Sequence, residues 1–162
     1  MRAKIMTGCL ALFISHLSFA EDETVLVINT APTEFAKSVN EEINKMGSKY
    51  HLVKFKNNDS DQSSPLSDYL SLNIGSHTDA IEYIDLVCNK VTTSTRLDRC
   101  LLFMPILGRS LDSDFDENSF FEAVGRNLDV KTSIAYRQGN IEYHLIHNIS
   151  KKQIKLEVAP YR

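Results

Sequence analysis

The longest apolar run after the first twenty residues is Cys100–Leu107, with the sequence CLLFMPIL. A continuous apolar run between polar segments is typical of a strand that is buried on both faces of a sheet. Pro105 cannot donate a backbone hydrogen bond and rarely lies inside a central strand, so we expect the strand to end near Met104. Residues 105–110 are then the loop that leaves this strand.

The first part of the chain has the pattern of a βαβ unit. Thr24–Ile28 is a β-branched apolar run and residues 50–55 alternate in part, so both are predicted strands. A helix is predicted between them, starting near Pro32, ending at Gly47 and carrying an apolar stripe of Phe35, Val39, Ile43 and Met46. Such a connection joins parallel strands and is right-handed, so the sheet is expected to begin as a parallel one.

The middle of the chain alternates between polar and apolar segments. Residues 56–64 contain no apolar side chain and are predicted to form an exposed, mobile loop, followed by a short helix at 65–72. Ser76–Asp79 has the spacing of a capping box, which predicts another helix directly after it. The core face of that helix would contain Ile81, Ile84, Cys88 and Val91, so Cys88 is expected to point inward.

The last third changes from helical to strand periodicity. An acidic loop at residues 112–117 precedes a predicted helix with a core face of Phe120, Phe121, Val124 and Leu128. An antiparallel meander of three strands is then predicted at residues 131–137, 141–148 and 154–158. The predicted fold class is α/β, a two-layer or three-layer sandwich with a parallel βαβ start and this C-terminal meander, forming a single domain over residues 21–162.

Residues 1–20 have the pattern of a signal peptide. Arg2 and Lys4 precede a short apolar segment, and the small residues Ser18 and Ala20 occupy the −3 and −1 positions of a cleavage site. The apolar segment is shorter than the ~20 residues that a spanning helix needs. We therefore expect a periplasmic protein, with full secretion as the alternative, and no membrane span after the leader is removed.

The charge of the chain argues against one class of partner. The sequence carries 18 Lys and Arg against 21 Asp and Glu. The leader holds two of the basic residues and none of the acidic ones, so the mature chain is more acidic than the whole. A nucleic-acid-binding domain presents a basic face, and nucleic acid is therefore not an expected partner.

Cys88 and Cys100 are the cysteines that lie outside the leader. In an oxidising compartment an isolated pair is expected to form a disulfide. The closed loop of about a dozen residues would contribute roughly 3 kcal/mol in the chain-entropy model. The alternative is a metal or redox pair, but the C-x-x-C spacing and a nearby histidine are both missing.

A parallel sheet would bring several polar loops together at one edge. In open α/β sheets, ligands bind beyond the carboxyl ends of the parallel strands. The loops expected there contain Asn29, Thr30, residues 56–58, Arg109 and Ser110. Arg109 and Ser110, facing a helix N-terminus near Thr33, could receive a carboxylate or phosphate. Ordinary polar loops explain the same residues without a ligand.

Asp112, Asp114 and Asp116 have the alternating spacing that begins an EF-hand calcium loop. The match then fails, because Glu117 stands where the turn glycine belongs and Ala123 occupies the position of the last glutamate. A solvated acidic loop before a helix N-terminus, favoured by the helix dipole, explains the same residues. No metal and no cofactor is therefore predicted.

The distribution of charge indicates a protein partner. An acidic loop precedes a C-terminal meander that is rich in basic residues. This asymmetry suits electrostatic steering of a partner protein, or equally an internal match between neighbouring elements. An outer strand of the meander could also pair with a partner chain. The predicted partner surface contains Asp112, Asp114, Asp116, Tyr143, Lys151 and Lys152.

The sequence contains no recognisable catalytic motif. Ser76, His77 and Asp79 are the residue types of a hydrolytic triad, but adjacent residues at a helix start do not place a hydroxyl on an imidazole. His144 and His147 are three apart on a predicted strand and should point to opposite faces. A hydrolytic site would have to assemble from distant segments.

Three functions follow from these observations, and the first is preferred. The protein is a non-catalytic envelope protein that binds another protein, as an accessory subunit, an inhibitor or an immunity-type protein. Alternatively, it senses or carries a small anionic molecule, or it is a small periplasmic hydrolase. The sequence does not determine the oligomeric state.

Overall fold

The computed structural model describes residues 25–47, 49–125 and 133–161. In this part the chain forms three helices and six strands. Their order is α1 (Pro32–Met46), β1 (Asp61–Pro65), β2 (Leu70–His77), β3 (Ala80–Cys88), α2 (Ser94–Leu111), α3 (Glu117–Gly125), β4 (Ser133–Gln138), β5 (Ile141–Asn148) and β6 (Gln153–Pro160). The predicted leader at 1–20 lies outside the described residues.

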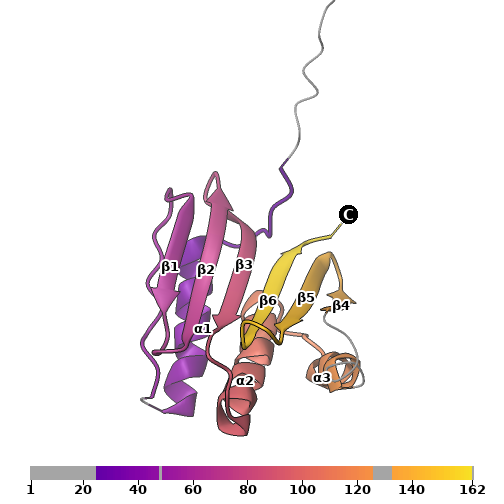
Figure 1. Ribbon diagram of the computed structural model, residues 1–162. Helices are drawn as coiled ribbons and strands as arrows, with labels where there is room; N and C mark the ends of the chain where they lie inside the picture. The colour runs from indigo at the N-terminus through magenta and orange to yellow at the C-terminus, as the bar shows by residue number, and fades with distance from the viewer. Residues whose placement is uncertain (1–24, 48, 126–132, 162) are drawn as a thin grey trace, which may run out of the picture.

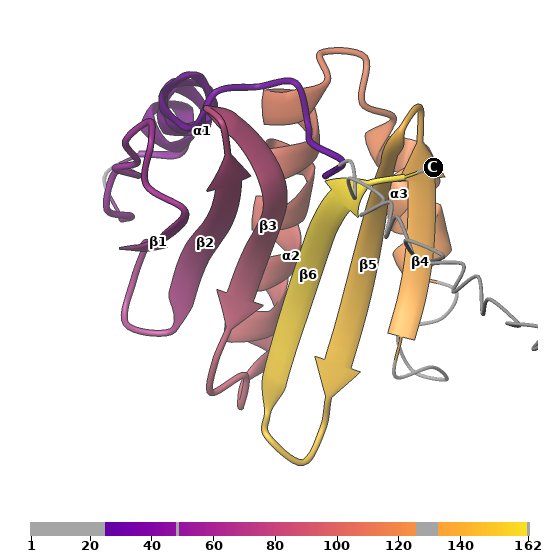
Figure 2. The ribbon, with the colours of Figure 1, turned by 90° about the horizontal axis from the view of Figure 1, so that it is seen from above.

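The six strands form one antiparallel sheet in the order β1-β2-β3-β6-β5-β4 (Figure 1). Two meanders, β1–β3 and β4–β6, join along β3 and β6. The helices cover one face of this sheet (Figure 2). The α/β class and the C-terminal antiparallel meander are confirmed, whereas the parallel βαβ start is wrong.

The two strands predicted near the N-terminus are absent from the sheet. Ile28 makes an isolated antiparallel bridge to Ile81, and residues 51–56 run beside β1 without a ladder. The backbone of this segment bonds to side chains of β1, as where Lys56 N donates a hydrogen bond to Gln62 Oε1 at 2.7 Å. Val53 and Phe55 are nevertheless buried. Their alternating apolar side chains resemble those of a strand because they are buried, although the backbone here is irregular.

The helices predicted at 65–72 and directly after Ser76–Asp79 are wrong, because residues 70–88 form the β2–β3 hairpin. Its turn contains Thr78 and Asp79, with φ angles of 46° and 66°, which is the primed turn geometry that matches the twist of paired strands. Ser76–Asp79 is thus a hairpin turn and not a capping box. Cys88 points inward as predicted, but it does so from a strand.

The apolar run Cys100–Leu107 lies in α2, so the predicted strand at 100–104 is wrong. Thr93 caps this helix, because its side chain accepts a hydrogen bond from Arg96 N. Pro105 lies inside the helix and is buried. A short apolar run cannot be assigned to strand or buried helix from its pattern alone, and here the helix buries most of its circumference.

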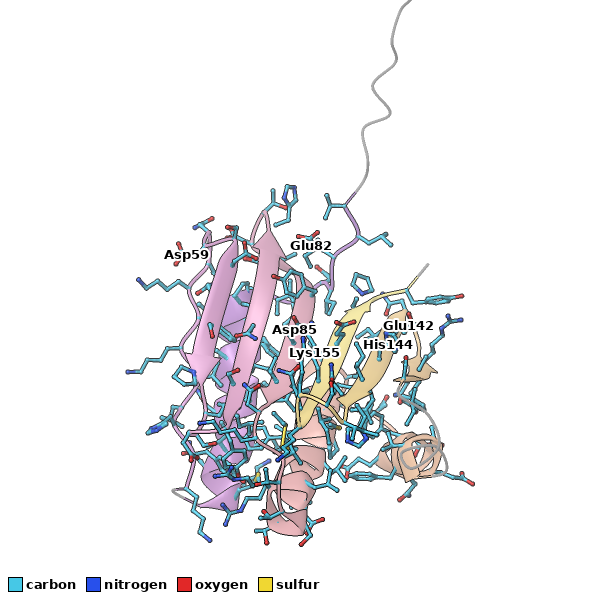
Figure 3. The ribbon with its side chains drawn as sticks, viewed as in Figure 1. Asp59, Glu82, Asp85, Glu142, His144 and Lys155 are labelled. Atoms are coloured by element: carbon cyan, nitrogen blue, oxygen red, sulfur yellow. A yellow bond between two sulfur atoms is a disulfide. The ribbon has the colours of Figure 1, made fainter. Side chains whose placement is uncertain are left out.

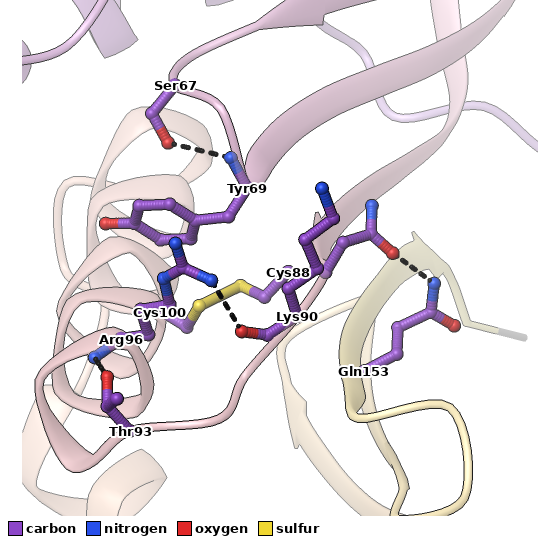
Figure 4. The surroundings of a disulfide bond; sticks show 9 residues. Ser67, Tyr69, Cys88, Lys90, Thr93, Arg96, Cys100 and Gln153 are labelled. Atoms are coloured by element: carbon purple, nitrogen blue, oxygen red, sulfur yellow. Dashed lines mark hydrogen bonds between the residues drawn. A yellow bond between two sulfur atoms is a disulfide. The ribbon is translucent and has the colours of Figure 1, made fainter.

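The predicted disulfide between Cys88 and Cys100 is confirmed (Figure 4). It joins the end of β3 to α2 across a Cα–Cα distance of 6.2 Å, and both cysteines are fully buried. Beside it, the Arg96 guanidinium lies 5.1 Å from the centre of the Tyr69 ring. The bond therefore attaches α2 to the inner face of the sheet.

The core lies between the helices and this inner face. The predicted stripe of α1 is buried at Phe35, Val39 and Ile43, while Met46 is exposed. In α3, Phe120 and Val124 are buried as predicted, and Leu128 lies outside the described residues. An aromatic cluster of Phe115, Phe120, Tyr136 and Tyr143 packs α3 against β4 and β5.

None of the described helices is long and apolar enough to cross a membrane.

Candidate functional site

The face of the sheet that points away from the helices is open in the described part of the chain (Figures 1 and 2). Side chains alternate along each strand, and the apolar ones are buried toward the helices. We call the opposite side the outer face. By the strand register, its charged and aromatic side chains include Asp61, Tyr83, Asp85, Arg137, Glu142, His144, Lys155 and Glu157. Asp85, Glu142, His144 and Lys155 are labelled in Figure 3.

The strand register aligns polar residues in a row across the outer face. Asn73 pairs with Asp85, Asp85 with Glu157, and Glu157 with His144. At one end of the row the Ser63 hydroxyl donates to Asn73 Oδ1 at 2.6 Å. Residues from β1, β2, β3, β6 and β5 thus form a continuous polar band that local sequence spacing does not show.

Ion pairs connect the centre of this band. Lys155 Nζ lies 2.9 Å from Asp85 Oδ2 and 2.7 Å from Glu157 Oε1. Partial burial raises the pKa of Asp85, and the neighbouring Lys155 opposes that rise. Lys155 is therefore already neutralised by two carboxylates and contributes little free positive charge to the surface.

The band continues from Glu157 to a serine on the edge strand. His144 Nδ1 lies 3.7 Å from Glu157 Oε2, and the opposite ring nitrogen, Nε2, forms a hydrogen bond with Ser133 Oγ. The hydroxyl of Ser133 on β4, the imidazole of His144 on β5 and the carboxylate of Glu157 on β6 therefore lie side by side across three strands. Sequence reasoning missed this grouping because it depends on the register of three strands.

A cavity of about 480 Å³ lies beside Ser133 and His144. The rest of its lining comes from the end of β5 and the following turn, namely Ile146, His147, Asn148, Ile149 and Ser150. Asn148 Oδ1 accepts hydrogen bonds from Ser150 Oγ at 2.9 Å and Lys151 N at 3.0 Å. These two bonds fix the orientation of the Asn148 amide.

The other end of the outer face is acidic. Asp61 accepts a hydrogen bond of 2.8 Å from the Tyr83 hydroxyl, and this bond raises the pKa of Tyr83. Glu82 is the extra residue of a bulge next to Tyr83, and Asp59 lies close to the same end (Figure 3). Among the described ion pairs, none involves Asp59, Asp61 or Glu82.

The residues of the predicted anion site have partners within the chain. The backbone N and Oγ1 of Thr33 both contact Asn57 Oδ1, and Thr30 accepts a backbone bond from Ile81. Arg109 lies in α2 and pairs with Glu42 and Glu117. Asn29 lies in the bend before α1, and the Ser110 hydroxyl is buried without a hydrogen-bond partner among the residues that the structure describes.

The antiparallel sheet removes the reason for placing these residues in one site, since no parallel strands end there. Within the described chain, no hydrogen bond or ion pair joins Arg109 to Asn29, Thr30 or Thr33. Anion binding by this group stays a prediction.

The predicted acidic partner loop is bound to the sheet. Gln138 donates to Asp112 Oδ2 at 3.0 Å and accepts from Asp116 N at 2.9 Å. Asp112 also accepts from Asp114 N, while Ser119 donates to the Asp116 carboxylate and lowers its pKa. These aspartates hold the loop and cap α3. In the described residues, no group of three or more His, Cys, Asp or Glu could hold a metal ion.

The remaining predicted partner residues differ in accessibility. Tyr143 is only 1 % exposed, and its burial raises the pKa of its phenol, so it does not present a side chain to a partner. Lys151 and Lys152 are exposed in the β5–β6 turn. Binding of a partner by these lysines is an untested prediction.

Comparison with protein-family models, curated proteins and solved structures gives no match to this chain. The geometry of the outer face therefore carries the functional argument.

Proposed function

We propose that the protein binds another protein through its outer face, and that the partner presents a basic surface. The observation that carries this proposal is the acidic end of the open sheet face, where Asp59, Asp61 and Glu82 make none of the described ion pairs. Complementary charge accelerates the encounter of two proteins and selects against partners of like charge.

Openness of the face alone would not support this function. Antiparallel sheets commonly pack one face on the core and leave the other in water. The charge balance is the distinguishing feature, since the basic groups of the outer face are already paired. Arg137 binds Glu142 at 2.7 Å, and Lys155 binds Asp85 and Glu157. The free charge on this face is therefore negative.

The proposed compartment is the periplasm, with secretion as the alternative. The leader pattern of residues 1–20 is the basis for this location. The disulfide between Cys88 and Cys100 supports it, because such bonds persist in oxidising compartments. In this setting the protein acts as an accessory, inhibitory or immunity-type subunit of the envelope.

The proposal is tested by comparative affinity purification from the native envelope. The baits are the mature oxidised protein, the double variant Asp59→Lys with Glu82→Lys, and the control Asp98→Lys. Asp98 is exposed on α2, on the helical side, and gives the same change of charge per site. We expect one partner to be recovered with the wild type and the control, and lost with the double variant.

Salt dependence gives a second readout of the same experiment. Recovery should fall as the ionic strength rises, since exposed charges are screened beyond about 8 Å at physiological salt. A partner that all three baits recover equally would place the interface elsewhere. Recovery of no stoichiometric partner by the wild type would contradict the binding function itself.

A further inference from the structure

We propose that Ser133, His144 and Glu157 form an acyl-transfer site that hydrolyses esters of small apolar acyl groups. This activity goes beyond the binding function proposed above and rests on a different part of the outer face. Ser133 is the nucleophile, His144 is the general base, and Glu157 positions the imidazole.

The register of three strands builds this arrangement. His144 of β5 lies directly opposite Glu157 of β6, while Ser133 of β4 lies opposite Ile146, two residues along β5 from His144. Side chains two residues apart on a strand share a face, and diagonal neighbours on adjacent strands lie within reach of longer side chains. The three groups therefore meet on the outer face.

Each imidazole nitrogen faces the partner that the chemistry requires. Ser133 Oγ is hydrogen-bonded to Nε2, and Glu157 Oε2 lies 3.7 Å from Nδ1. In serine hydrolases the base must contact the nucleophile through one nitrogen, while a carboxylate orients it through the other. The order of groups here satisfies that requirement.

Glu157 is itself held in place. Its second oxygen, Oε1, binds Lys155 Nζ at 2.7 Å, and Lys155 also binds Asp85 at 2.9 Å. This contact leaves Oε2 directed toward His144. The ion pairs at the centre of the outer face thus support the carboxylate that positions the base.

The adjacent cavity provides room for a substrate. Its volume is about 480 Å³, and Ile146 and Ile149 supply apolar surface for an acyl chain. Asn148 lines the same cavity, and its side-chain oxygen is occupied by Ser150 and Lys151. The remaining amide N–H groups are suited to donate to an oxyanion. A small apolar acyl ester matches this lining.

The reaction proceeds in two steps. Ser133 Oγ attacks the ester carbonyl carbon, and its proton passes to His144 Nε2. The bond between the carbonyl carbon and the alcohol oxygen breaks, and the leaving alcohol takes the proton from Nε2. Water then attacks the acyl-serine by the same proton transfers, which releases the carboxylic acid and restores the Ser133 hydroxyl.

The test uses the mature oxidised protein, p-nitrophenyl butyrate as substrate and a fluorophosphonate probe that labels nucleophilic serines. Ser133→Ala and His144→Ala should each lower ester turnover by at least about a hundredfold, the scale of a lost nucleophile or base. Ser71→Ala is the control, since Ser71 is a strand serine on the same face, on β2. It should keep wild-type turnover and labelling.

The role of Glu157 is tested by measuring kcat and KM separately, because a purely structural role would not lower kcat alone. Glu157→Gln should lower kcat and leave KM nearly unchanged, and Glu157→Asp should recover part of kcat. A thermal melt of each variant confirms that it is folded. Folded wild type without labelling or turnover would overturn the proposal, as would Ser133→Ala with wild-type turnover or Glu157→Gln with unchanged kcat.

Discussion

At the scale of single residues, Gly75 and Tyr83 show how the outer face is shaped. The two residues are opposite each other on β2 and β3, and the Tyr83 ring lies over the glycine. A Cβ added at Gly75 would lie 2.1 Å from Tyr83 Cε1. Any larger residue must therefore displace the ring and the hydrogen bond from its hydroxyl to Asp61.

Gly75→Ala is expected to destabilise the protein by about 1–2 kcal/mol, the range for overpacking against a partly exposed ring. Gly125→Ala is the matched control, because no atom of the described residues lies within 4 Å of its added Cβ. Alanine there should be neutral or stabilise the helix by up to about 1 kcal/mol. Urea unfolding of both variants measures the difference, and equal effects would contradict the packing of Tyr83 on Gly75.

Glu42 links two helices by charge. It binds Lys45 within α1 and Arg109 of α2, and the hydrogen bond from Lys45 is the main cause that lowers its pKa, with Arg109 adding to the effect. A carboxyl with a lowered folded-state pKa stabilises the protein above its unfolded-state pKa. That contribution is lost as the pH falls through the folded-state pKa.

Glu42→Gln should therefore cost about 0.5–1 kcal/mol at neutral pH, as partly exposed ion pairs do. The difference from wild type should shrink as the pH falls below about 4. Glu41→Gln, at an exposed position next in the sequence, is the control and should change the free energy of unfolding by less than about 0.5 kcal/mol. Chemical unfolding at pH 7 and pH 3 measures both variants. A difference that stays constant with pH would exclude the ionic contribution.

At the scale of elements, the disulfide attaches helix α2 to the sheet. Cys88 ends β3 and Cys100 lies in the second turn of α2, so the bond limits how far the helix can move from the inner face. Both cysteines are buried in the core between them. The bond therefore lowers the conformational entropy of the unfolded chain and holds α2 against the sheet in the folded protein.

Replacing both cysteines by serine should lower the free energy of unfolding by roughly 3 kcal/mol, the value for a loop of this length. Reduced wild type is the natural control, because it lacks the bond but keeps the core side chains. Guanidinium unfolding of the oxidised, reduced and double-serine proteins gives the comparison. Oxidised and reduced proteins of equal stability would show that the bond does not contribute.

Some elements could be predicted from sequence because one periodicity dominates their pattern. The stripe of α1 repeats at helical spacing, and the meander β4–β6 alternates along most of its length, with glycine in its first turn. In contrast, residues 81–88 fit both periods, since Ile81, Ile84 and Cys88 also occur at helical spacing. Pairing with β2 and β6 decides in favour of the strand.

The prediction of a strand at 100–104 is wrong for a related reason. The residues of the run at 100–107 are apolar in succession, so the pattern carries no period, and Pro105 favours the end of a strand when sequence alone is considered. The proline instead lies in a helix whose surroundings are apolar on several sides. The parallel topology was predicted from the strands at 24–28 and 50–55, and the error at 100–107 added the loop with Arg109 and Ser110 to the same edge, which gave the predicted anion site.

At the scale of the whole molecule, the outer face is the part of the account that sequence could not supply. Ser133, His144, Glu157, Lys155 and Asp85 come from four strands, and the register alone brings them together. Two meanders meeting at β3 and β6 create this face, while the helices leave it uncovered (Figures 1 and 2). The sequence alone could predict the disulfide partners, whereas the periplasmic compartment stays a prediction.

The outer face is the surface through which we propose that the protein binds its partner. The most direct measurement is site-specific photo-crosslinking in cells that express the protein natively. A benzoylphenylalanine placed at Tyr83, on the outer face, is compared with one at Leu102, which is exposed on α2. We expect a discrete adduct from position 83 and none from position 102. An adduct formed only from position 102 would contradict this proposal.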